Sequence, residues 1–314
     1  MITALGASPS LDVTYVVDDY RIGEIHRPRS VIRVAGGKAL NASRAATLLG
    51  ADVRAIALLG GALGDAVCAD AELSGVAVTR VDTKAETREC VSVLSLEGDR
   101  LTEVYEHPSP VTAAEWSRAL EATAAALDER TGWLMISGGM PASLGENALV
   151  DVLEVARRAG SRVALDSHGA ALRAALEQGY VALLKVNRAE AAEVLDLPAD
   201  SPLLDLARAL QCRTSGAVVV TDGVGGAIGV DTDGSAVHVS LLGHTGAYPV
   251  GSGDSFLGAL VVALDAGHSL ESGMRSGTAA ATANAMVPGA ARFTRAEADA
   301  LLPDVRVIPI GARP

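Results

Sequence analysis

The hydrophobic and polar positions follow a regular rhythm from about residue 113 onward. Apolar residues recur at helical spacing over 115–129 and 148–160. Short, nearly continuous apolar runs occupy 133–137, 162–166 and 181–187, as in strands that are buried on both faces. This alternation of strand and helix predicts an α/β fold whose central sheet is mainly parallel and covered by helices.

The predicted strands end in polar residues. Asp166, Asn187 and Asp222 each close an apolar run. Because the carboxyl ends of parallel strands lie along one edge of a sheet, where α/β proteins bind ligands, we expect a ligand site at this edge. The chain contains no Pro/Ser-rich linker, charge block or internal repeat, so 1–314 is predicted to form a single domain.

Two stretches, 12–35 and 87–106, break this rhythm because they contain strand-like patches with no helix between them. Such segments predict a small β-sheet that projects over the ligand edge as a lid and excludes water from a reactive group. The alternative is a set of ordinary edge strands. The patches are 14–17, 31–34, 90–96 and 101–105, with a turn signal at Glu97, Gly98 and Asp99.

Composition limits the classes of ligand. With 49% apolar residues among 314, the chain can bury a substantial core. Its net charge of -12 argues against nucleic acids and anionic membranes as partners, so the expected ligand is a small molecule. No apolar stretch reaches the roughly 18 to 20 residues that cross a bilayer, and no secretory signal is recognisable. The dispersed cysteines, Cys68, Cys90 and Cys212, fit a reducing cytoplasm.

The segment 249–255, followed by the apolar run 256–264, is the strongest candidate for a catalytic element. Gly251 and Gly253 allow the backbone to bring N–H groups toward a ligand, and the following helix adds the positive end of its dipole, so we expect an anion there. A carboxylate beside a bound phosphate, as Asp254 would be, requires a task such as taking the proton from an attacking hydroxyl. The alternative is a glycine-rich loop in which Asp254 only caps the helix.

A second glycine-rich turn, AGGKALN at 35–41, also precedes a predicted helix. Its paired glycines permit close approach of a hydroxylated ligand, Lys38 supplies a mobile positive charge, and Asn41 can donate and accept hydrogen bonds. These properties suit a polar anion, although the spacing of a Walker A loop is absent. The alternative is a turn with a solvated lysine.

A third glycine-rich segment occupies 221–226. It precedes a strand, turn and strand pattern over 227–239, whereas a dinucleotide fingerprint must open a helix. This context argues against a nicotinamide-dependent Rossmann enzyme. It predicts instead a tight loop over the phosphates or ribose of a nucleotide, with a plain hairpin as the alternative.

Seven motifs occur in an order and spacing that extend over nearly the whole chain. They are SPSLD at 8–12, AGGKALNASR at 35–44, ETREC at 86–90, ISGGMP at 136–141, LDSHGAAL at 165–172, LLKVNRAE at 183–190 and PVGSGDS at 249–255. Together they resemble the ribokinase-like (PfkB) carbohydrate kinases, and most closely the branch of tagatose-6-phosphate kinase and 1-phosphofructokinase. The resemblance implies a ribokinase-like three-layer α/β fold with a β-sheet lid, and a homodimer paired through the lid.

The resemblance also implies an activity and its cofactors. With ATP and Mg²⁺, the γ-phosphoryl group would pass to a hydroxyl of a ketohexose phosphate such as tagatose 6-phosphate, fructose 6-phosphate or fructose 1-phosphate. Asp254 is similar to the general base of the family, and the backbone N–H groups of Gly251, Ser252 and Gly253 are similar to its anion hole. The metal-associated positions, which act through the waters of the ion, are Glu190 and Asp166. The nucleotide-side positions are Lys185, Asn187, Thr221, Gly223, Gly226 and Asn284, the last beside the adenine.

On the sugar side, the resemblance implies hydroxyl-binding positions and a phosphate clamp. The former are Asp12, Gly37 and Asn41, and the latter are Lys38, Arg88 and Arg27. Three departures affect this half: Ala39 replaces a glycine, and His26 and Glu89 stand where relatives have asparagine. Glu89 would repel a sugar phosphate unless strand alternation turns it away. Two alternatives therefore stay open, namely phosphorylation of an unphosphorylated sugar, as by ribokinases or nucleoside kinases, and a sugar-phosphate-binding regulator without catalysis.

Many relatives in this family bind a monovalent cation near the anion hole through an Asp-x-Thr stretch. Here Tyr248, Pro249 and Val250 occupy that stretch, and no carboxylate remains. Potassium would gain little from leaving water for neutral ligands. The sequence therefore predicts activity that is independent of potassium and still requires magnesium.

Overall fold

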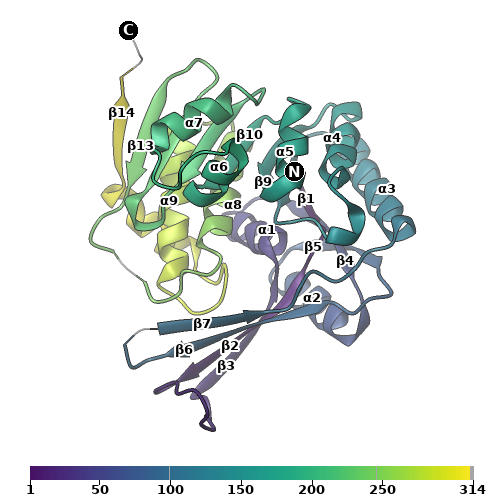
Figure 1. The fold of residues 1–314 in the computed structure, drawn as a ribbon, viewed down its shortest axis with the longest axis vertical. Coiled ribbons are helices and arrows are strands. Elements are labelled where there is room, and N and C mark those ends of the chain that lie inside the picture. The colour runs from purple at the N-terminus through teal and green to yellow at the C-terminus, as the bar shows by residue number, and fades with distance from the viewer. Residues whose placement is uncertain (99, 245, 312–314) are drawn as a thin grey trace.

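The structure of the protein is a computed structural model that describes residues 1–98, 100–244 and 246–311. A large sheet runs through the centre of the molecule (Figure 1). Its strands within the described residues are β1 (Ile2–Gly6), β4 (Val53–Leu59), β5 (Ala77–Asp82), β8 (Trp133–Ser137), β9 (Arg162–Asp166), β10 (Leu183–Asn187), β11 (Ala217–Thr221), β12 (Ala227–Val230), β13 (Ala236–Ser240) and β14 (Arg306–Ile310). Their order is β14-β13-β12-β11-β10-β9-β8-β1-β4-β5.

The central sheet is mainly parallel, as predicted. The strands from β5 through β11 in this order all run parallel, whereas β12, β13 and β14 add an antiparallel edge. The register sets Ser137 beside Asp166, and Asn187 beside Thr221. The polar ends of neighbouring strands therefore meet along one edge of the sheet, which is where a ligand site was expected.

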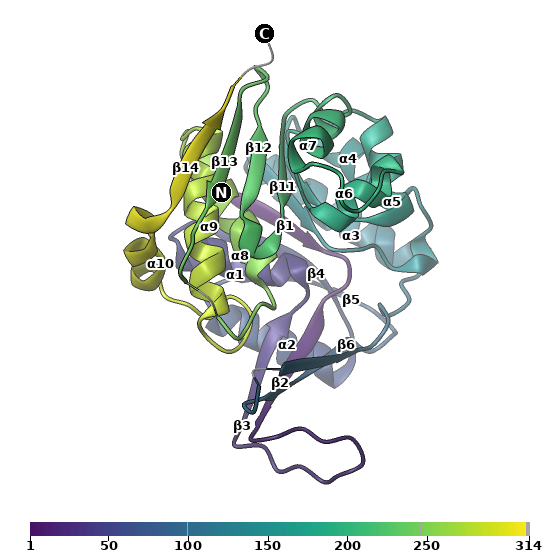
Figure 2. The same ribbon diagram turned by 60° about the vertical axis from the view of Figure 1, so that its left-hand side comes forward.

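Helices cover both faces of the sheet, which gives the body its three layers (Figure 2). One layer contains α1 (Lys38–Leu48), α2 (Gly61–Leu73), α8 (Ser252–Asp265), α9 (Leu270–Ala285) and α10 (Arg295–Leu301), and its apolar side chains form one core cluster with the sheet. The opposite layer and its core cluster contain α3 (Ala113–Glu129), α4 (Ala148–Arg158), α5 (Gly169–Glu177), α6 (Arg188–Leu195) and α7 (Leu203–Gln211). Short 3-10 helices in the described chain are Ala142–Leu144, Gly223–Gly225 and Leu302–Asp304.

The segments predicted as a lid form a second, smaller sheet that projects from the body (Figures 1 and 2). Leu11 and Val13 face the body on one side of this sheet and pack in the same core cluster as Val67 of α2, which fixes the root of the lid. The predicted turn includes Asp99, which lies outside the described residues. The strands are β2 (Ser10–Val17), β3 (Ser30–Gly36), β6 (Arg88–Ser95) and β7 (Arg100–Tyr105), in the order β3-β2-β6-β7.

Among the helices that the structure describes, none combines the length and the apolar character that spanning a bilayer requires.

Candidate active site

A cavity of about 680 Å³ lies between the lid and the carboxyl ends of the central strands. Its walls come from β2, β6 and β7 of the lid, from the ends of β8, β10 and β11, and from the first turns of α1 and α8. The sequence places these segments far apart, and the fold brings them to one site. The predicted site residues that line the cavity are Asp12, Gly37, Lys38, Asn41, Arg88, Lys185, Asn187, Thr221, Gly223, Gly251, Ser252, Gly253 and Asp254.

Asp254 lies in the first turn of α8 and is almost completely buried. Its Oδ2 accepts a hydrogen bond from Asn41 Nδ2 at 3.0 Å. Burial, followed by the nearby Asp166 carboxylate, raises the pKa of Asp254 to about 6, although Lys38, Asn41 and Lys185 oppose the rise. A carboxylate that ionises near pH 6 is charged at neutral pH and is still a stronger base than an exposed aspartate, which suits proton abstraction from a hydroxyl.

The backbone turn before Asp254 depends on glycine. Gly251 has φ of 80°, in the left-handed region that favours glycine, and a Cβ there would lie 2.6 Å from Cβ of Ala290. The turn leads into α8, a helix of 14 residues whose first N–H groups carry the positive end of its dipole. The cavity therefore meets backbone donors directly beside the buried carboxylate. This pairing can hold an anion and remove a proton in one place.

Asp166 is fully buried between two lysines at the end of β9. Its Oδ2 accepts from Lys185 Nζ at 2.6 Å, and its Oδ1 accepts from Lys38 Nζ at 3.0 Å. Burial alone would raise the pKa of Asp166, but the two ammonium groups outweigh it and hold the pKa below its ordinary value. Asp166 therefore stays ionised and fixes both lysines at the cavity wall.

Lys38 bridges Asp166 and Glu190, whose Oε1 lies 3.3 Å from Lys38 Nζ. Burial would lower the pKa of Lys38, but these two carboxylates raise it above its ordinary value. The predicted clamp of Lys38 with Arg88 is accordingly not assembled in this structure, because the Lys38 ammonium already has two anionic partners at the strand ends.

Asn187 and Glu190 form a capping box at the start of α6. Glu190 N donates to Asn187 Oδ1 at 2.9 Å, and Asn187 N donates to Glu190 Oε2 at 2.9 Å. The predicted Asn-x-x-Glu pair thus has a structural role of its own, and it leaves Glu190 Oε1 directed to Lys38. Over 1–98, 100–244 and 246–311, no three His, Cys, Asp or Glu side chains are close enough to hold a metal ion by themselves.

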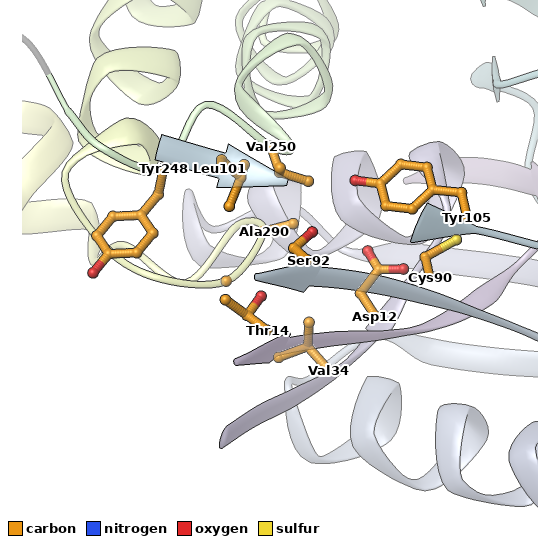
Figure 3. Close-up of a pocket in the computed structure, with 11 residues that line it drawn as sticks. Asp12, Thr14, Val34, Cys90, Ser92, Leu101, Tyr105, Tyr248, Val250 and Ala290 are labelled. Carbon is orange, nitrogen blue, oxygen red and sulfur yellow. The ribbon is translucent and has the colours of Figure 1, made fainter. Parts of the chain in front are cut away.

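Asp12 lies on the inner face of the lid, beside the cavity (Figure 3). Its Oδ1 accepts from Ser10 Oγ at 2.6 Å, and burial raises the pKa of Asp12 to about 6 against the opposing effects of Ser10, Arg44 and Arg88. The Asp12 carboxylate occupies the space that a side chain on Gly36 would need: a Cβ on Gly36 would lie only 2.0 to 2.2 Å from the carboxylate atoms of Asp12. The first glycine of the pair is therefore explained by the close approach of Asp12.

Arg88 lies on the same face of the lid as Asp12, since Ser10 pairs with Arg88 across β2 and β6. Its Nη1 donates to the carbonyl oxygen of Glu106 at 2.9 Å, and its Nη2 to that of Ser8 at 3.5 Å. Glu89 follows Arg88 on β6 and does not line the cavity. Strand alternation thus turns the Glu89 carboxylate away from the face that Arg88 uses.

Four buried polar atoms around the cavity have no hydrogen-bond partner within the described chain. Seven side chains among the described residues have a buried polar atom without a partner, and four of these seven line the cavity. The unpaired atoms are therefore concentrated at this one site. Buried polar groups of folded proteins are nearly always paired, so atoms that gather unpaired around one cavity indicate a polar ligand. The four atoms are Ser8 Oγ, Asn41 Oδ1, Arg88 Nε and Ser137 Oγ.

Three further predicted residues lie elsewhere. Arg27 is exposed in the segment between β2 and β3 and does not line the cavity. Gly226 packs against β13, since a Cβ there would lie 2.1 Å from the carbonyl oxygen of Val239. Asn284, expected beside the adenine, is fully buried, and its amide donates to Val250 in the loop before α8 and to Ser252 at the start of that helix. Gly226 and Asn284 therefore serve contacts within the protein, and Arg27 lies exposed away from the cavity.

The cavity also includes residues to which the sequence assigned no role. Ser137 ends β8, His168 follows β9 by two residues, and Tyr105 ends β7. Ser137 and His168 lie within quoted motifs, and their position directly after buried strands was the signal that could have found them. Tyr105 carried no such signal, because only the pairing of Cys90 with Tyr105 across β6 and β7 brings it to Asp12.

A buried base, backbone donors at a helix start, and a lid over the ends of parallel strands define the class of a phosphoryl-transfer enzyme. The chain belongs to the pfkB family of carbohydrate kinases, whose model matches residues 2–296. This confirms the predicted family and the transferase class.

Solved structures agree with this assignment. Phosphofructokinase-2 from Escherichia coli in complex with potassium is 26% identical, with a TM-score of 0.88 over 96% of this chain and 98% of that one. The same enzyme in complex with fructose-6-phosphate has a TM-score of 0.86 at 26% identity over the same shares. A possible 1-phosphofructokinase from Thermotoga maritima, 19% identical with a TM-score of 0.90 over 99% and 100%, shares the fold. The ribokinase-like fold with its lid is thereby confirmed.

Proposed function

We propose that the protein transfers the γ-phosphoryl group of ATP to a hydroxyl of a ketohexose phosphate, such as tagatose 6-phosphate, fructose 6-phosphate or fructose 1-phosphate. The observation that carries the proposal is the shared cavity. It contains a buried carboxylate with a pKa of about 6 at the start of α8. It also contains Arg88 Nε and three polar oxygens that have no hydrogen-bond partner among the described residues. The carboxylate suits proton abstraction from a hydroxyl, and the atoms without partners suit a hydroxylated, anionic sugar.

In the proposed mechanism, Asp254 takes the proton of the attacking hydroxyl. The hydroxyl oxygen forms a bond to the γ-phosphorus, the bond from that phosphorus to the β,γ-bridging oxygen breaks, and ADP leaves with the electron pair. Asn41 Nδ2 holds the Asp254 carboxylate in place, while Asn41 Oδ1 is free within the described chain to accept a hydrogen bond from the sugar. The backbone N–H groups of Gly251 and Gly253 neutralise the charge that builds on the transferred group, whereas the predicted third donor, Ser252 N, donates to the carbonyl oxygen of Pro249 at 3.1 Å in this structure.

We propose Mg²⁺ as the metal. Asp166 and Glu190 fit the water shell of such an ion, because their carboxylates already share one positive group, the Lys38 ammonium. An ion held there with ATP would supply positive charge that offsets the negative charge of the phosphates. Lys185, held at 2.6 Å from Asp166, adds a second positive charge from the protein on this side of the cavity, beside Asn187 and Thr221.

A coupled ADP-release assay over phosphorylated and free ketoses and aldoses tests the proposal. We expect the highest kcat/KM with a ketohexose phosphate. Turnover only with free sugars would instead support the ribokinase-like alternative, and Arg88 would then serve the lid. Absence of turnover with every sugar, together with measurable sugar-phosphate binding, would support a regulator without catalysis.

We also propose that two copies pair through the lid, in the cytoplasm. Among the described residues, half of the large hydrophobic side chains that are exposed lie on the lid and its connections, including Ile22 at 96% exposure and Ile25 at 88%. Arg27 lies in the same connection and would then approach the partner. Light scattering after gel filtration should find a dimer for the wild type and a monomer for Ile25→Lys. Leu73→Lys, on the body and also at 88%, is the matched control and should stay dimeric; an unchanged Ile25→Lys dimer would contradict the proposal.

A further inference from the structure

Asn284 occupies the last turn of α9 and is fully buried, and both polar atoms of its amide are hydrogen-bonded. Nδ2 donates to the carbonyl oxygen of Val250 at 2.8 Å and to Ser252 Oγ at 3.0 Å, and it lies 3.5 Å from the carbonyl oxygen of Tyr248. Oδ1 accepts from Ala291 N at 2.6 Å. Since a backbone carbonyl can only accept and a backbone N–H can only donate, these partners fix which way the amide points.

The contacts join three pieces of backbone into one unit around the catalytic turn. Val250 and Ser252 flank Gly251, and Ala290 packs where a Cβ on Gly251 would clash. Figure 3 shows Val250 and Ala290 among the side chains that line a pocket between this turn and the lid. Ala291 is a buried residue with φ of 51°, which is unusual for alanine and persists only where the surroundings impose it. The hydrogen bond from Ala291 N to Asn284 Oδ1 is one such constraint.

Three oxygens that converge on one point are the arrangement that holds a monovalent cation. The similar phosphofructokinase-2 has been solved in complex with potassium. In this chain, the oxygens of Tyr248, Val250 and Ser252 instead surround the NH2 group of Asn284, and Tyr248 stands where the family pattern has a carboxylate. The residues at this point therefore do not fit a potassium ion: the positive end of a neutral amide dipole already satisfies the oxygens.

We propose that Asn284 is a positioning residue that holds the anion-binding turn in its working shape and replaces a monovalent cation in doing so. The proposal rests on the phosphoryl-transfer function proposed above, and it gives Asn284 a role different from contact with the adenine. An amide that is covalently part of the helix needs no ion from solution. It also explains how the turn keeps its shape without the acidic ligand that a cation would require.

The test compares the wild type with Asn284→Ala and Asn284→Asp in potassium and in tetramethylammonium at equal ionic strength and saturating magnesium. Wild-type kcat should be the same in both salts. Asn284→Ala should lower kcat by about 10-fold to 100-fold, which is no more than the decrease in kcat on removing one anion-hole donor. The affinity for ADP should change only a few-fold. Potassium should restore part of kcat in Asn284→Ala and more in Asn284→Asp, whose carboxylate supplies the missing charge.

A second readout does not depend on activity. Potassium should raise the Tm of Asn284→Asp in a concentration-dependent way and leave the Tm of the wild type unchanged, because only the variant gains an ion site. Thr123→Ala is the control for loss of a buried polar helix side chain: Thr123 is also fully buried, and its Oγ1 donates only to Ala119 of its own helix, on the opposite face of the sheet. It should show no response to potassium.

Wild-type kcat that rises several-fold with potassium, or Asn284→Ala with wild-type kcat, would overturn the proposal. If a variant fails to fold, the wild-type comparison between the two salts still decides. If no sugar is phosphorylated, the proposed function fails, but the Tm comparison between wild type and Asn284→Asp still tests the role of the amide.

Discussion

Replacing Asp254 by asparagine should abolish most turnover and, at the same time, stabilise the fold. Asparagine has nearly the shape of aspartate, and its Oδ1 can still accept from Asn41 Nδ2, but it cannot take a proton from a hydroxyl. Loss of a general base lowers rates by roughly 10² to 10⁴. The stability effect has a separate origin, which is the burial of the carboxylate.

The pKa of Asp254 rises from 3.8 to about 6 on folding. A raised pKa means that the folded protein prefers the protonated form, so this preference stabilises the fold fully below pH 3.8 and is lost as the pH rises through about 6. At pH 8, keeping Asp254 ionised in the folded protein therefore costs about 3 kcal/mol, and at pH 5.5 about 2 kcal/mol. Asparagine avoids this cost, which corresponds to a rise in Tm of roughly 4 to 5 °C at pH 8 for a chain of this length.

Asp166→Asn is the matched comparison, because Asp166 is equally buried but its pKa lies below the ordinary value. Neutralising it leaves the ammonium groups of Lys185 and Lys38 without their shared anion, and breaking a buried pair costs about 3 to 5 kcal/mol. The two substitutions are chemically identical and should shift Tm in opposite directions. Thermal melting from pH 5.5 to pH 8, without nucleotide or magnesium, measures both.

A Tm for Asp254→Asn below that of the wild type at pH 8 would show that burial does not destabilise the ionised Asp254 carboxylate. A near-wild-type kcat would refute its assignment as base. The two results are independent, so one can fail without the other.

Four further predictions follow from the same geometry. Because Asp254 and Asp12 both have a pKa of about 6, log(kcat/KM) should fall below pH 6 with a slope approaching two, and Asp12→Asn should reduce the slope to one. Arg88→Ala should raise KM for a sugar phosphate by about 10-fold to 100-fold more than KM for the free sugar, whereas equal effects would show that Arg88 does not bind the phosphate. Gly251→Ala should abolish turnover, while Gly234→Ala, with similar φ and no neighbour within 4 Å, should retain it; equal activity would exclude a role for the turn. Removing Mg²⁺ with EDTA should abolish turnover and weaken the ATP binding that calorimetry measures. Unchanged affinity would show that the metal does not offset the charge of ATP at this site.

Much of the fold could be predicted from the sequence because it follows from short-range periodicity. The apolar runs at 133–137 and 162–166 coincide with β8 and β9, and the helix expected over 115–129 begins only two residues earlier. That earlier start reflects a capping box of Thr112 with Glu115, in which each side chain bonds the backbone of the other. The strand ends met as expected because parallel strands leave few alternatives.

Individual side chains of the site were harder to predict, because long or buried side chains choose partners by tertiary position. Lys38 follows paired glycines in a motif that suggests a substrate phosphate, but its flexible stem carries the ammonium to Asp166, 128 positions later in the chain. Asn284 resembled a ligand contact by its place in a motif. Its burial, which depends on how α9 packs against α8, decides that it bonds the backbone instead.

The balance of charges at the site supports the proposed Mg²⁺. At the proposed nucleotide end of the cavity, the ammonium groups that face the carboxylates of Asp166, Glu190 and Asp254 within the described chain are those of Lys38 and Lys185. Once Asp254 is ionised, as a base must be, this group is net negative and cannot neutralise ATP. Both lysines are already paired with carboxylates, so they maintain the geometry more than they attract phosphate. In the proposed mechanism, the positive charge for phosphoryl transfer would therefore be supplied by Mg²⁺ bound with the nucleotide, and the backbone turn that Asn284 contacts would supply the remaining donors.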